Sequence, residues 1–324
     1  MKKIEIKKDI YYVGSIDYEI RNFHGYLTQR GTTYNSYLII DEKITLVDTT
    51  KAPFANDLIE KIKQIIDPSK ISYIIANHVE MDHSGAIPEV MKYCPNAEIV
   101  TCAKGKAGIE RHFKKDFNYK IVKSGDVLNI GKRNLEFALT PMVHWPDNMV
   151  AYLREDKILF SNDGFGQHLA CEERFDSEYD LDIVMEEAQK YYANIVLPYD
   201  GPAKRELEAA KKFDFEIIAP SHGVVWVDNV EKIVSNYIKW ANNETKKKVV
   251  LVYDTMWEST EKMANSILSA FEEKNYEIEK CYLQKMHISD IMTKIIDAEY
   301  ICVGSPILNK NILPTVSAFV TFLR

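Results

Sequence analysis

A cluster of four potential metal ligands constrains the fold of this chain more than any other feature. The cluster lies in NHVEMDHSG, residues 77–85, at the end of the apolar run ISYIIAN, residues 71–77. The run is typical of a buried strand. In an extended or looped segment residues two apart point to the same side, so His78, Glu80 and Asp82 can converge. One segment cannot complete a metal site, so the fold must bring further ligands to this strand end.

Two histidines and an aspartate elsewhere also follow strand-like runs. His144 stands in TPMVHWPDNM, Asp163 in LFSNDGFGQH and His222 in IIAPSHGVVW. Sites in α/β folds collect their ligands at strand ends. Taken singly, a residue of this kind at such a position is more often a buried residue or a turn residue than a metal ligand. Together with His83, which follows Asp82, they supply enough donors for two metal ions about 3.5–4 Å apart with a bridging carboxylate.

Composition excludes several other classes of protein. The chain has 324 residues, 46% hydrophobic and 27% charged, with a formal net charge of −7. This balance predicts no nucleic-acid partner. No apolar run approaches the ~20 residues of a membrane span, and MKKIEIKKDI at the start lacks the apolar region of a signal peptide. The five cysteines include no CxxC pair, which favours free thiols in a cytoplasmic protein over disulfides or a thiolate-held iron centre.

The order of strand-like and helix-like segments predicts two α/β domains. Residues 1–243 mix strands with helices, which indicates two sheets with helices outside. A polar break, NNETKKK, covers residues 242–248, and the apolar run VVLVYD follows it. Residues 244–324 then read strand–helix–strand–helix–strand, the start of a doubly wound parallel sheet.

The pattern H-x-E-x-D-H, with His, Asp and His downstream, resembles the metallo-β-lactamase-like domain of flavodiiron proteins. Hydrolases of that superfamily usually carry H-x-H-x-D-H and bind zinc, whereas position 80 here is glutamate. A carboxylate makes the site harder and more anionic, which suits iron that cycles with oxygen-type substrates. The resemblance implies an αββα sandwich with two non-haem irons. One iron would take His78, Glu80 and His144, the other Asp82, His83 and His222, and Asp163 would bridge them.

A second site is predicted after the strand VVLVY, where DTMWEST runs into a helix. Hydroxyl groups and the unpaired N–H groups of a helix N-terminus can hold a phosphate, although a plain Ser/Thr helix cap is the simpler interpretation. The loop GSPILNKNILP follows the third strand. The two loops resemble the FMN-binding loops of flavodoxin. A flavodoxin-like part that follows a metal-binding domain in the chain is the order found in flavodiiron proteins. The resemblance implies FMN contacts by these residues: Thr255, Met256, Trp257, Glu258, Ser259, Thr260, Pro306, Leu308, Asn309 and Asn311.

The flavodoxin-like part differs from its family in length. A flavodoxin-like domain has five strands, whereas residues 244–324 provide three and part of a helix. We therefore expect a C-terminally truncated domain that binds FMN weakly or not at all.

Three further residues are candidates for catalytic or supporting roles in the substrate pocket: His24, His168 and Tyr192. The resemblance places His24, in RNFHGY, over the substrate pocket, where an ordinary loop histidine is the alternative. His168, in GFGQH, can support a ligand. Tyr192, in KYYANIV, can line the pocket or only pack.

The resemblance implies an oxidoreductase that reduces dioxygen to water, nitric oxide to nitrous oxide, or both. FMN would pass electrons from an external donor such as rubredoxin, and a head-to-tail homodimer would bring flavin and irons together. A zinc hydrolase of esters or thioesters is the alternative, against which Glu80 and the flavodoxin-like segment argue. A non-catalytic flavoprotein electron carrier ranks last, because it gives the ligand cluster no purpose.

Overall fold

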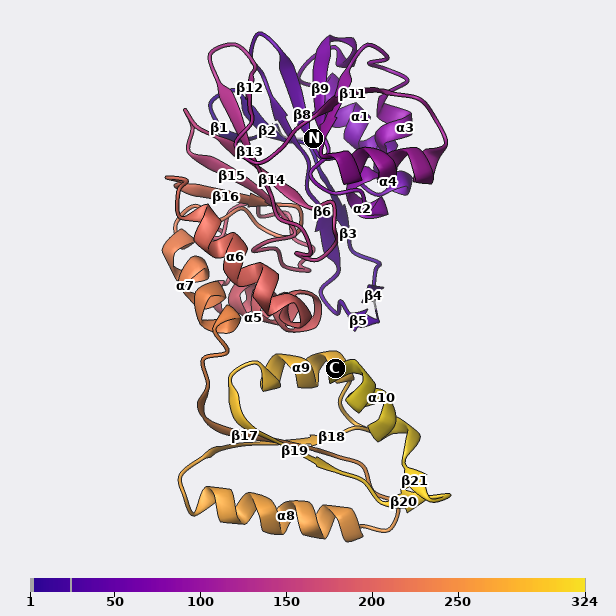
Figure 1. Cartoon of the computed structure of the whole chain (residues 1–324), viewed down its shortest axis with the longest axis vertical. Helices are drawn as coiled ribbons and strands as arrows, with labels where there is room; N and C mark the ends of the chain where they lie inside the picture. Colours follow the sequence, from indigo (N-terminus) through magenta and orange to yellow (C-terminus); the bar gives the residue numbers. More distant parts are fainter. Residues whose placement is uncertain (1–2, 24, 324) are drawn as a thin grey trace.

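The computed structural model describes residues 3–23 and 25–323. Two β-sheets stack face to face in the N-terminal part, and helices cover both outer faces (Figure 1). Ile75 and Val100 of one sheet pack between the layers against Phe137 and Phe160 of the other. Burial of both inner faces stabilises this stack. The predicted αββα sandwich is thus confirmed.

The first sheet has the strand order β1-β2-β7-β8-β9-β10-β11 and is parallel from β8 onward. Parallel neighbours need crossover connections, and helices supply them on the outer face. The strands are β1 (Ile4–Lys7), β2 (Ile10–Tyr12), β7 (Tyr37–Ile39), β8 (Ile44–Val47), β9 (Ile71–Ile75), β10 (Glu98–Thr101) and β11 (Asn118–Ile121). The helical segments are η1 (Ala52–Phe54), α1 (Ala55–Lys63), η2 (Pro68–Lys70), α2 (Met81–Ser84), α3 (Ile87–Val90) and α4 (Ala103–Phe113).

The second sheet has the order β12-β13-β14-β15-β16 and is antiparallel except for the last pair. Its strands are β12 (Val127–Asn129), β13 (Asn134–Leu139), β14 (Met149–Leu153), β15 (Ile158–Asn162) and β16 (Ile217–Pro220). Its helices are α5 (Leu181–Tyr191), the π-helical turn η3 (Tyr192–Val196), η4 (Leu197–Tyr199), α6 (Asp200–Ala210) and α7 (Val230–Ala241). Two short pairs lie beside the sheets: β3 (Ser15–Asp17) with β6 (Thr32–Tyr34), and β4 (Asn22–Phe23) with β5 (Tyr26–Leu27).

The C-terminal part is a parallel sheet of order β18-β17-β19 with helices on both faces (Figure 1). Val249 and Leu251 of β17 pack toward α8, whereas Val250 and Val252 pack toward α9 and α10. This burial on both faces explains the continuous apolar run, and it confirms the doubly wound start. The elements are β17 (Lys246–Tyr253), α8 (Ser259–Glu272), β18 (Glu277–Tyr282), α9 (Ile288–Ile295), β19 (Ala298–Gly304), β20 (Ile307–Leu308), β21 (Asn311–Ile312) and α10 (Pro314–Leu323).

The two parts meet where α9 packs against α5 and η3. The Lys190 ammonium lies 2.6 Å from the Asp290 carboxylate, and Gln189 donates a hydrogen bond to the Thr293 carbonyl. The predicted boundary near residue 244 falls between α7 and β17, and the division into domains 1–243 and 244–324 stays a prediction. In the described residues, no helix combines the length and apolar character that a membrane crossing requires.

Candidate metal centre and flavin loops

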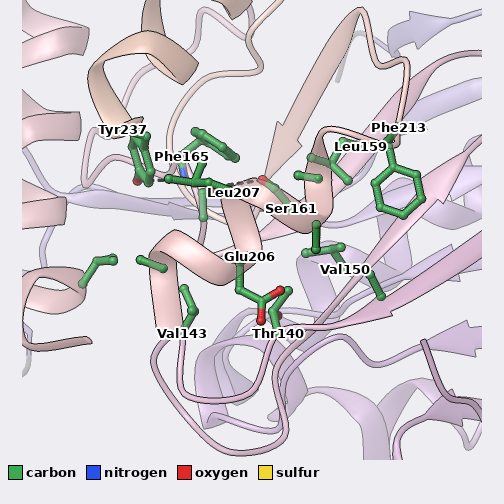
Figure 2. Close-up of a pocket in the computed structure, with 16 residues that line it drawn as sticks. Thr140, Val143, Val150, Leu159, Ser161, Phe165, Glu206, Leu207, Phe213 and Tyr237 are labelled. Carbon is green, nitrogen blue, oxygen red and sulfur yellow. Dashed lines mark hydrogen bonds between the residues drawn. The ribbon is translucent and has the colours of Figure 1, made fainter. Parts of the chain in front are cut away.

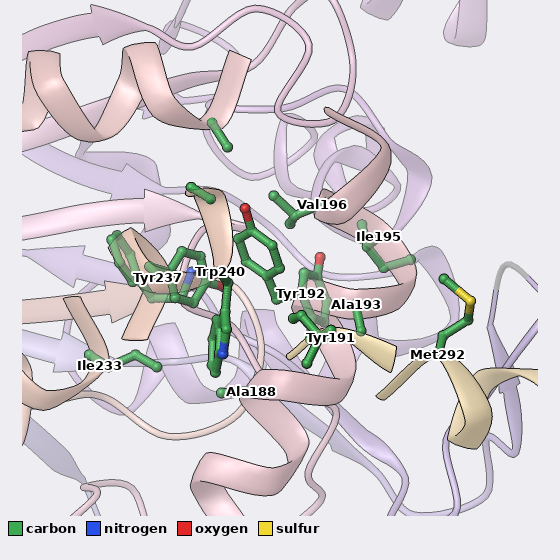
Figure 3. Close-up of a cluster of buried hydrophobic side chains, with 14 of the residues drawn as sticks. Ala188, Tyr191, Tyr192, Ala193, Ile195, Val196, Ile233, Tyr237, Trp240 and Met292 are labelled. Atoms are coloured by element: carbon green, nitrogen blue, oxygen red, sulfur yellow. Dashed lines mark hydrogen bonds between the residues drawn. The ribbon is translucent and has the colours of Figure 1, made fainter. Parts of the chain in front are cut away.

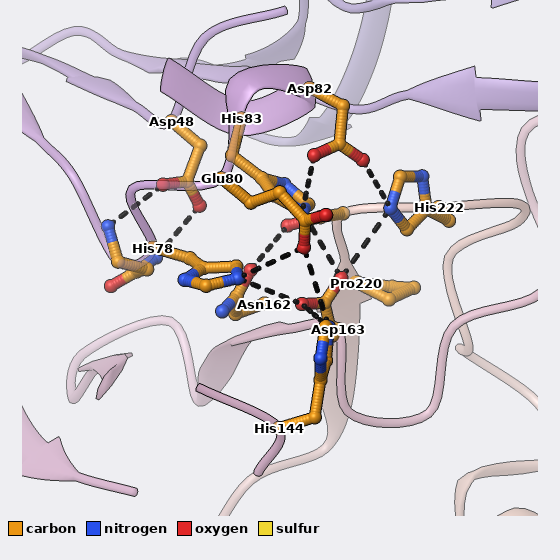
Figure 4. A network of polar contacts seen from close by, with 12 residues as sticks. Asp48, His78, Glu80, Asp82, His83, His144, Asn162, Asp163, Pro220 and His222 are labelled. Carbon is orange, nitrogen blue, oxygen red and sulfur yellow. Dashed lines mark hydrogen bonds and ion pairs between the residues drawn. The ribbon is translucent and has the colours of Figure 1, made fainter. Parts of the chain in front are cut away.

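Loops that follow strands of both sheets bring the predicted metal ligands to one place (Figure 4). The first sheet supplies the loop after β9, and the second supplies the loops after β13, β15 and β16. All of these loops leave their strands at the same edge of the stacked sheets. The residues that meet there are His78, Glu80, Asp82, His83, His144, Asp163 and His222.

The local backbone of the first ligand segment differs from the expected extended one. His78 and Glu80 precede a short helix, α2, which begins at Met81 and carries Asp82 and His83. The Glu80 carbonyl accepts hydrogen bonds from the backbone N–H of His83 at 3.0 Å and of Ser84 at 2.9 Å. Asp82 therefore reaches the cluster from a helical turn rather than by strand alternation.

The donors form two groups that share Asp163. In the described residues the potential ligand sets are His78 with His144 and Asp163, and Asp82 with His83 and His222. Asp163 Oδ2 lies 3.5 Å from His144 Nε2 in the first group. Asp163 Oδ1 lies 3.2 Å from His83 Nε2 and 3.4 Å from His222 Nε2 in the second.

Glu80 belongs to the first group. Its Oε2 atom lies 3.3 Å from His78 Nε2 and 3.5 Å from His144 Nε2. In the second group, Asp82 Oδ2 lies 3.2 Å from His222 Nε2. Each group thus combines two imidazole rings with a carboxylate of its own.

Sharp turns present Asp163 and His222 to the cluster. Asn162 and Phe165, on either side of Asp163, have φ values of 55° and 66°, in the left-handed region. Gly223 follows His222 with φ +79°, and a Cβ there would lie 2.0 Å from Gln167 Oε1. Such backbone is costly for most residues and persists where surrounding structure enforces it.

Hydrogen bonds fix which nitrogen of two histidines faces the cluster. The His222 Nδ1–H donates to the Thr33 carbonyl at 2.6 Å, since a carbonyl can only accept. His78 Nδ1 lies 2.9 Å from Asp147 Oδ2, which also accepts a hydrogen bond from the Val79 N–H at 2.8 Å. Both rings therefore direct Nε2 inward, as is usual for metal-ligating histidine.

The electrostatics of the cluster call for a cation. Burial by itself would lower the pKa of His222, but the Asp163 and Asp82 carboxylates outweigh it and raise that pKa to about 10. Burial would raise the pKa of Asp163, yet the surrounding histidines, His83 first, hold it well below its usual range. Within the described residues, Asp82 Oδ1 and Oδ2, Asp163 Oδ2 and His83 Nε2 are buried and make no hydrogen bond. Because buried charges are expensive unless paired or bound to metal, the donor set fits two metal ions.

The predicted pocket residues fall in different places. His24 lies outside the described residues. His168 is buried behind His222, with ring centres 5.0 Å apart, and its Nδ1 lies 2.8 Å from Thr32 Oγ1. It is thus placed to support the cluster from the side.

Tyr192 packs away from the cluster, which is the second of the two alternatives that its sequence context left open. Its hydroxyl donates to Asp200 Oδ1 at 3.2 Å, and its ring lies against Tyr237 and Trp240 (Figure 3). The preceding residue, Tyr191, faces the cluster instead, with its ring centre 6.1 Å from that of His222.

Sequence reasoning missed Tyr191 and Asp147. Tyr191 continues the buried positions Val184 and Ala188 along α5 at helical spacing, but Tyr192 fits the same spacing, so the pattern alone does not choose between them. Asp147 lies three residues after His144 in the same loop, where a carboxylate beside a ligand histidine is a common arrangement.

The two predicted flavin loops meet at the carboxyl edge of the C-terminal sheet, where the Asp254 N–H donates to the Gly304 carbonyl at 3.2 Å. A pocket at this edge is lined by Thr255, Met256 and Trp257, together with Leu313 and Thr315. Thr255 Oγ1 is buried there without a hydrogen-bond partner among the described residues. The edge therefore offers a free hydroxyl beside an open pocket.

The other predicted flavin residues surround this edge. Glu258 is exposed and precedes α8, whose first residue is Ser259, and Thr260 is buried against the sheet. Leu308, Asn309 and Asn311 lie exposed in the β20–β21 hairpin, and Pro306 precedes it. They do not line the pocket beside Thr255.

Comparison with known proteins agrees with this architecture. Residues 32–223 match the model of a family described as ODP family beta lactamase. The nitric oxide reductase of Moorella thermoacetica is 44% identical over 97% of this chain and 80% of its own length. The rubredoxin-oxygen oxidoreductase of Megalodesulfovibrio gigas is 39% identical over 100% of this chain and 82% of its own length. The crystal structure of the flavodiiron protein from Giardia intestinalis superposes with a TM-score of 0.97 at 33% identity, over 100% of this chain and 80% of that one.

The fold and the site define a metallo-β-lactamase-like protein with a flavodoxin-like sheet, and its similar proteins are reductases. This chain belongs to the flavodiiron protein family and is an oxidoreductase.

Proposed function

We propose that this protein reduces dioxygen to water, nitric oxide to nitrous oxide, or both, at a diiron centre held by the seven-donor cluster. The observation that carries the proposal is the pair of donor groups joined by Asp163, with Glu80 where zinc hydrolases of this fold usually have histidine. His78, Glu80 and His144 would hold one iron, and the other group the second. When bound, the two irons would supply the redox chemistry of the reduction, and FMN would supply the electrons.

The protein residues around the centre have defined tasks in this proposal. Glu80, Asp82 and Asp163 supply anionic oxygen donors, which favour a hard ferric ion over zinc. Asp147 and the Thr33 carbonyl hold two imidazole rings in their ligating tautomers.

Tyr191 is the best-placed hydrogen-bond donor. Burial, followed by the charges of Asp163 and Asp82, raises the pKa of its hydroxyl well above the usual value, so the group stays protonated. A protonated hydroxyl beside the cluster can donate a hydrogen bond, but its raised pKa makes it a weak acid. Reduction consumes four protons for each dioxygen, or two for each pair of nitric oxide molecules, and these would come from solvent.

For the electron input we propose FMN at the edge that carries Thr255–Thr260 and the β20–β21 hairpin, with a rubredoxin-like external donor. The names of the similar reductases support this donor. We also propose a head-to-tail dimer in which the flavin of one subunit serves the irons of the other.

Gas consumption by chemically reduced protein tests the proposal independently of the natural donor. Protein produced with iron and zinc both available and reduced with excess dithionite should retain two irons per chain. It should consume dioxygen or nitric oxide faster than the same dithionite solution without protein. A protein that holds zinc alone and cleaves ester or thioester substrates would show the hydrolase instead.

A further inference from the structure

An apolar cavity lies under α6, on the outer face of the second sheet (Figure 2). Its volume is about 70 Å³. The walls come from strands β13, β14 and β15 and from the helices above them, and they include Ala138, Val150, Leu159, Phe165, Ala203 and Phe213.

Polar groups at the wall are largely satisfied by one another. Ser161 Oγ donates to the Gly164 carbonyl at 2.6 Å, and the Phe165 N–H donates to the Tyr237 hydroxyl at 2.8 Å. Among the described lining residues Glu206 alone carries a carboxyl group, and burial raises its pKa to about 7. A pocket whose lining is mostly apolar accepts small apolar guests.

The cavity borders two of the metal-donor segments. Val143, which lines it, directly precedes His144, and Gly164, which also lines it, directly follows Asp163. A guest in the cavity is therefore separated from the donor cluster by the backbone of these two loops.

The volume restricts the guest to a very small molecule. A dry apolar cavity of roughly 150 Å³ holds benzene or xenon. The present cavity, at about 70 Å³, is half as large and matches a diatomic gas or one xenon atom. Transfer of an apolar gas from water into it is favourable for the same reason that burial of apolar surface is.

We propose that this cavity is a docking site for an apolar diatomic gas and supplies that gas to the neighbouring metal centre. This inference rests on the proposed function, because dioxygen and nitric oxide are the substrates in question.

Xenon binding tests the site without reference to catalysis. Crystals of the wild-type protein under xenon pressure should show an anomalous peak between Val150, Leu159 and Phe165. The variant Ala203→Leu, which fills the cavity, should lose the peak. Ala270→Leu adds the same atoms at an exposed position of α8 and should keep it.

Steady-state kinetics test the supply role. Ala203→Leu should raise the KM for the gas several-fold and leave kcat and iron content unchanged, whereas Ala270→Leu should change neither constant. Leu207→Phe, at a half-buried position of α6, serves as a second filling variant if Ala203→Leu does not fold. In the wild-type protein, xenon pressure should raise the KM for the gas, because xenon competes with the gas for the cavity.

The outcomes separate this inference from the proposed function. A wild-type protein that turns over but shows no xenon peak, or whose KM is unaffected by filling and by xenon, overturns the docking site. A wild-type protein that consumes neither gas contradicts the proposed function. It also contradicts the supply role, even if xenon binds in the cavity.

Discussion

At the residue scale, Glu80 distinguishes this site from a zinc hydrolase. Glu80→His recreates the usual hydrolase pattern and removes an anionic donor that lies 3.3 Å from His78 Nε2. We expect the variant to bind iron roughly 10- to 100-fold more weakly and to bind zinc preferentially. Metal analysis after growth with both metals measures this change. Glu60→His, at an exposed position of α1, is the control and should bind metals as the wild type does.

Asp147 acts through His78 rather than on the metal directly. Asp147→Asn keeps a hydrogen-bond acceptor beside His78 Nδ1 but removes its charge. Because the carboxylate raises the basicity of the ring, we predict a loss of metal affinity of about 10- to 100-fold with little change in fold. Competition with a chelator at fixed pH measures the affinity, and Asp116→Asn, at an exposed position, is the control. Equal affinities in the two variants would show that Asp147 does not tune the ligand.

The sequence identified the seven clustered residues because each stands just after an apolar run, and strand ends converge at sheet edges. The roles of Tyr191 and Asp147 were not predicted, because they depend on the direction in which a helix and a loop face. The choice between Tyr191 and Tyr192 depends on the packing of α5, which places Tyr192 against Tyr237 and Trp240.

At the scale of single elements, α6 carries a carboxyl group whose ionisation opposes folding. Burial raises the pKa of Glu206 from 4.5 to about 7, and Arg205 offsets this shift only in part. Between these pH values the folded state retains a proton that the unfolded state releases. Glu206 therefore lowers the free energy of unfolding as pH rises from about 4.5 to about 7, and adds no further change above that.

Glu206→Gln removes this titration. We predict that the difference in unfolding free energy between the variant and the wild type grows in favour of the variant from pH 4.5 to 7. Urea unfolding at several pH values measures it. Glu208→Gln, on the same helix and exposed, should track the wild type. A difference that does not vary with pH would contradict the raised pKa.

Element types were predictable where the pattern was clear, from a continuous apolar run for β17 and from helical spacing for α8. The sheet order was not, because the pairing of β2 with β7, for example, is set by long-range packing. Short elements were also missed. Helix α2 covers only Met81–Ser84, and its hydrogen bonds to Glu80 and Val79 depend on local contacts that leave no periodic pattern in the sequence.

At the scale of the whole molecule, an ion pair ties the C-terminal sheet to the N-terminal part. Lys190, almost fully buried, lies 2.6 Å from Asp290 on α9. Asp290→Asn leaves this ammonium without its charged partner, and we expect a loss of about 1–3 kcal/mol in the free energy of unfolding. Limited proteolysis between α7 and β17 should become faster in parallel. Asp182→Asn, an exposed change on α5, should alter neither quantity.

The central claim is that this one chain holds two irons in a single centre around Asp163. The Mössbauer spectrum of protein enriched in iron-57 tests it most directly. We predict two irons per chain in an exchange-coupled ferric pair, lost together in Asp163→Ala. A spectrum of isolated irons, or a wild-type protein that binds only zinc, would contradict the account.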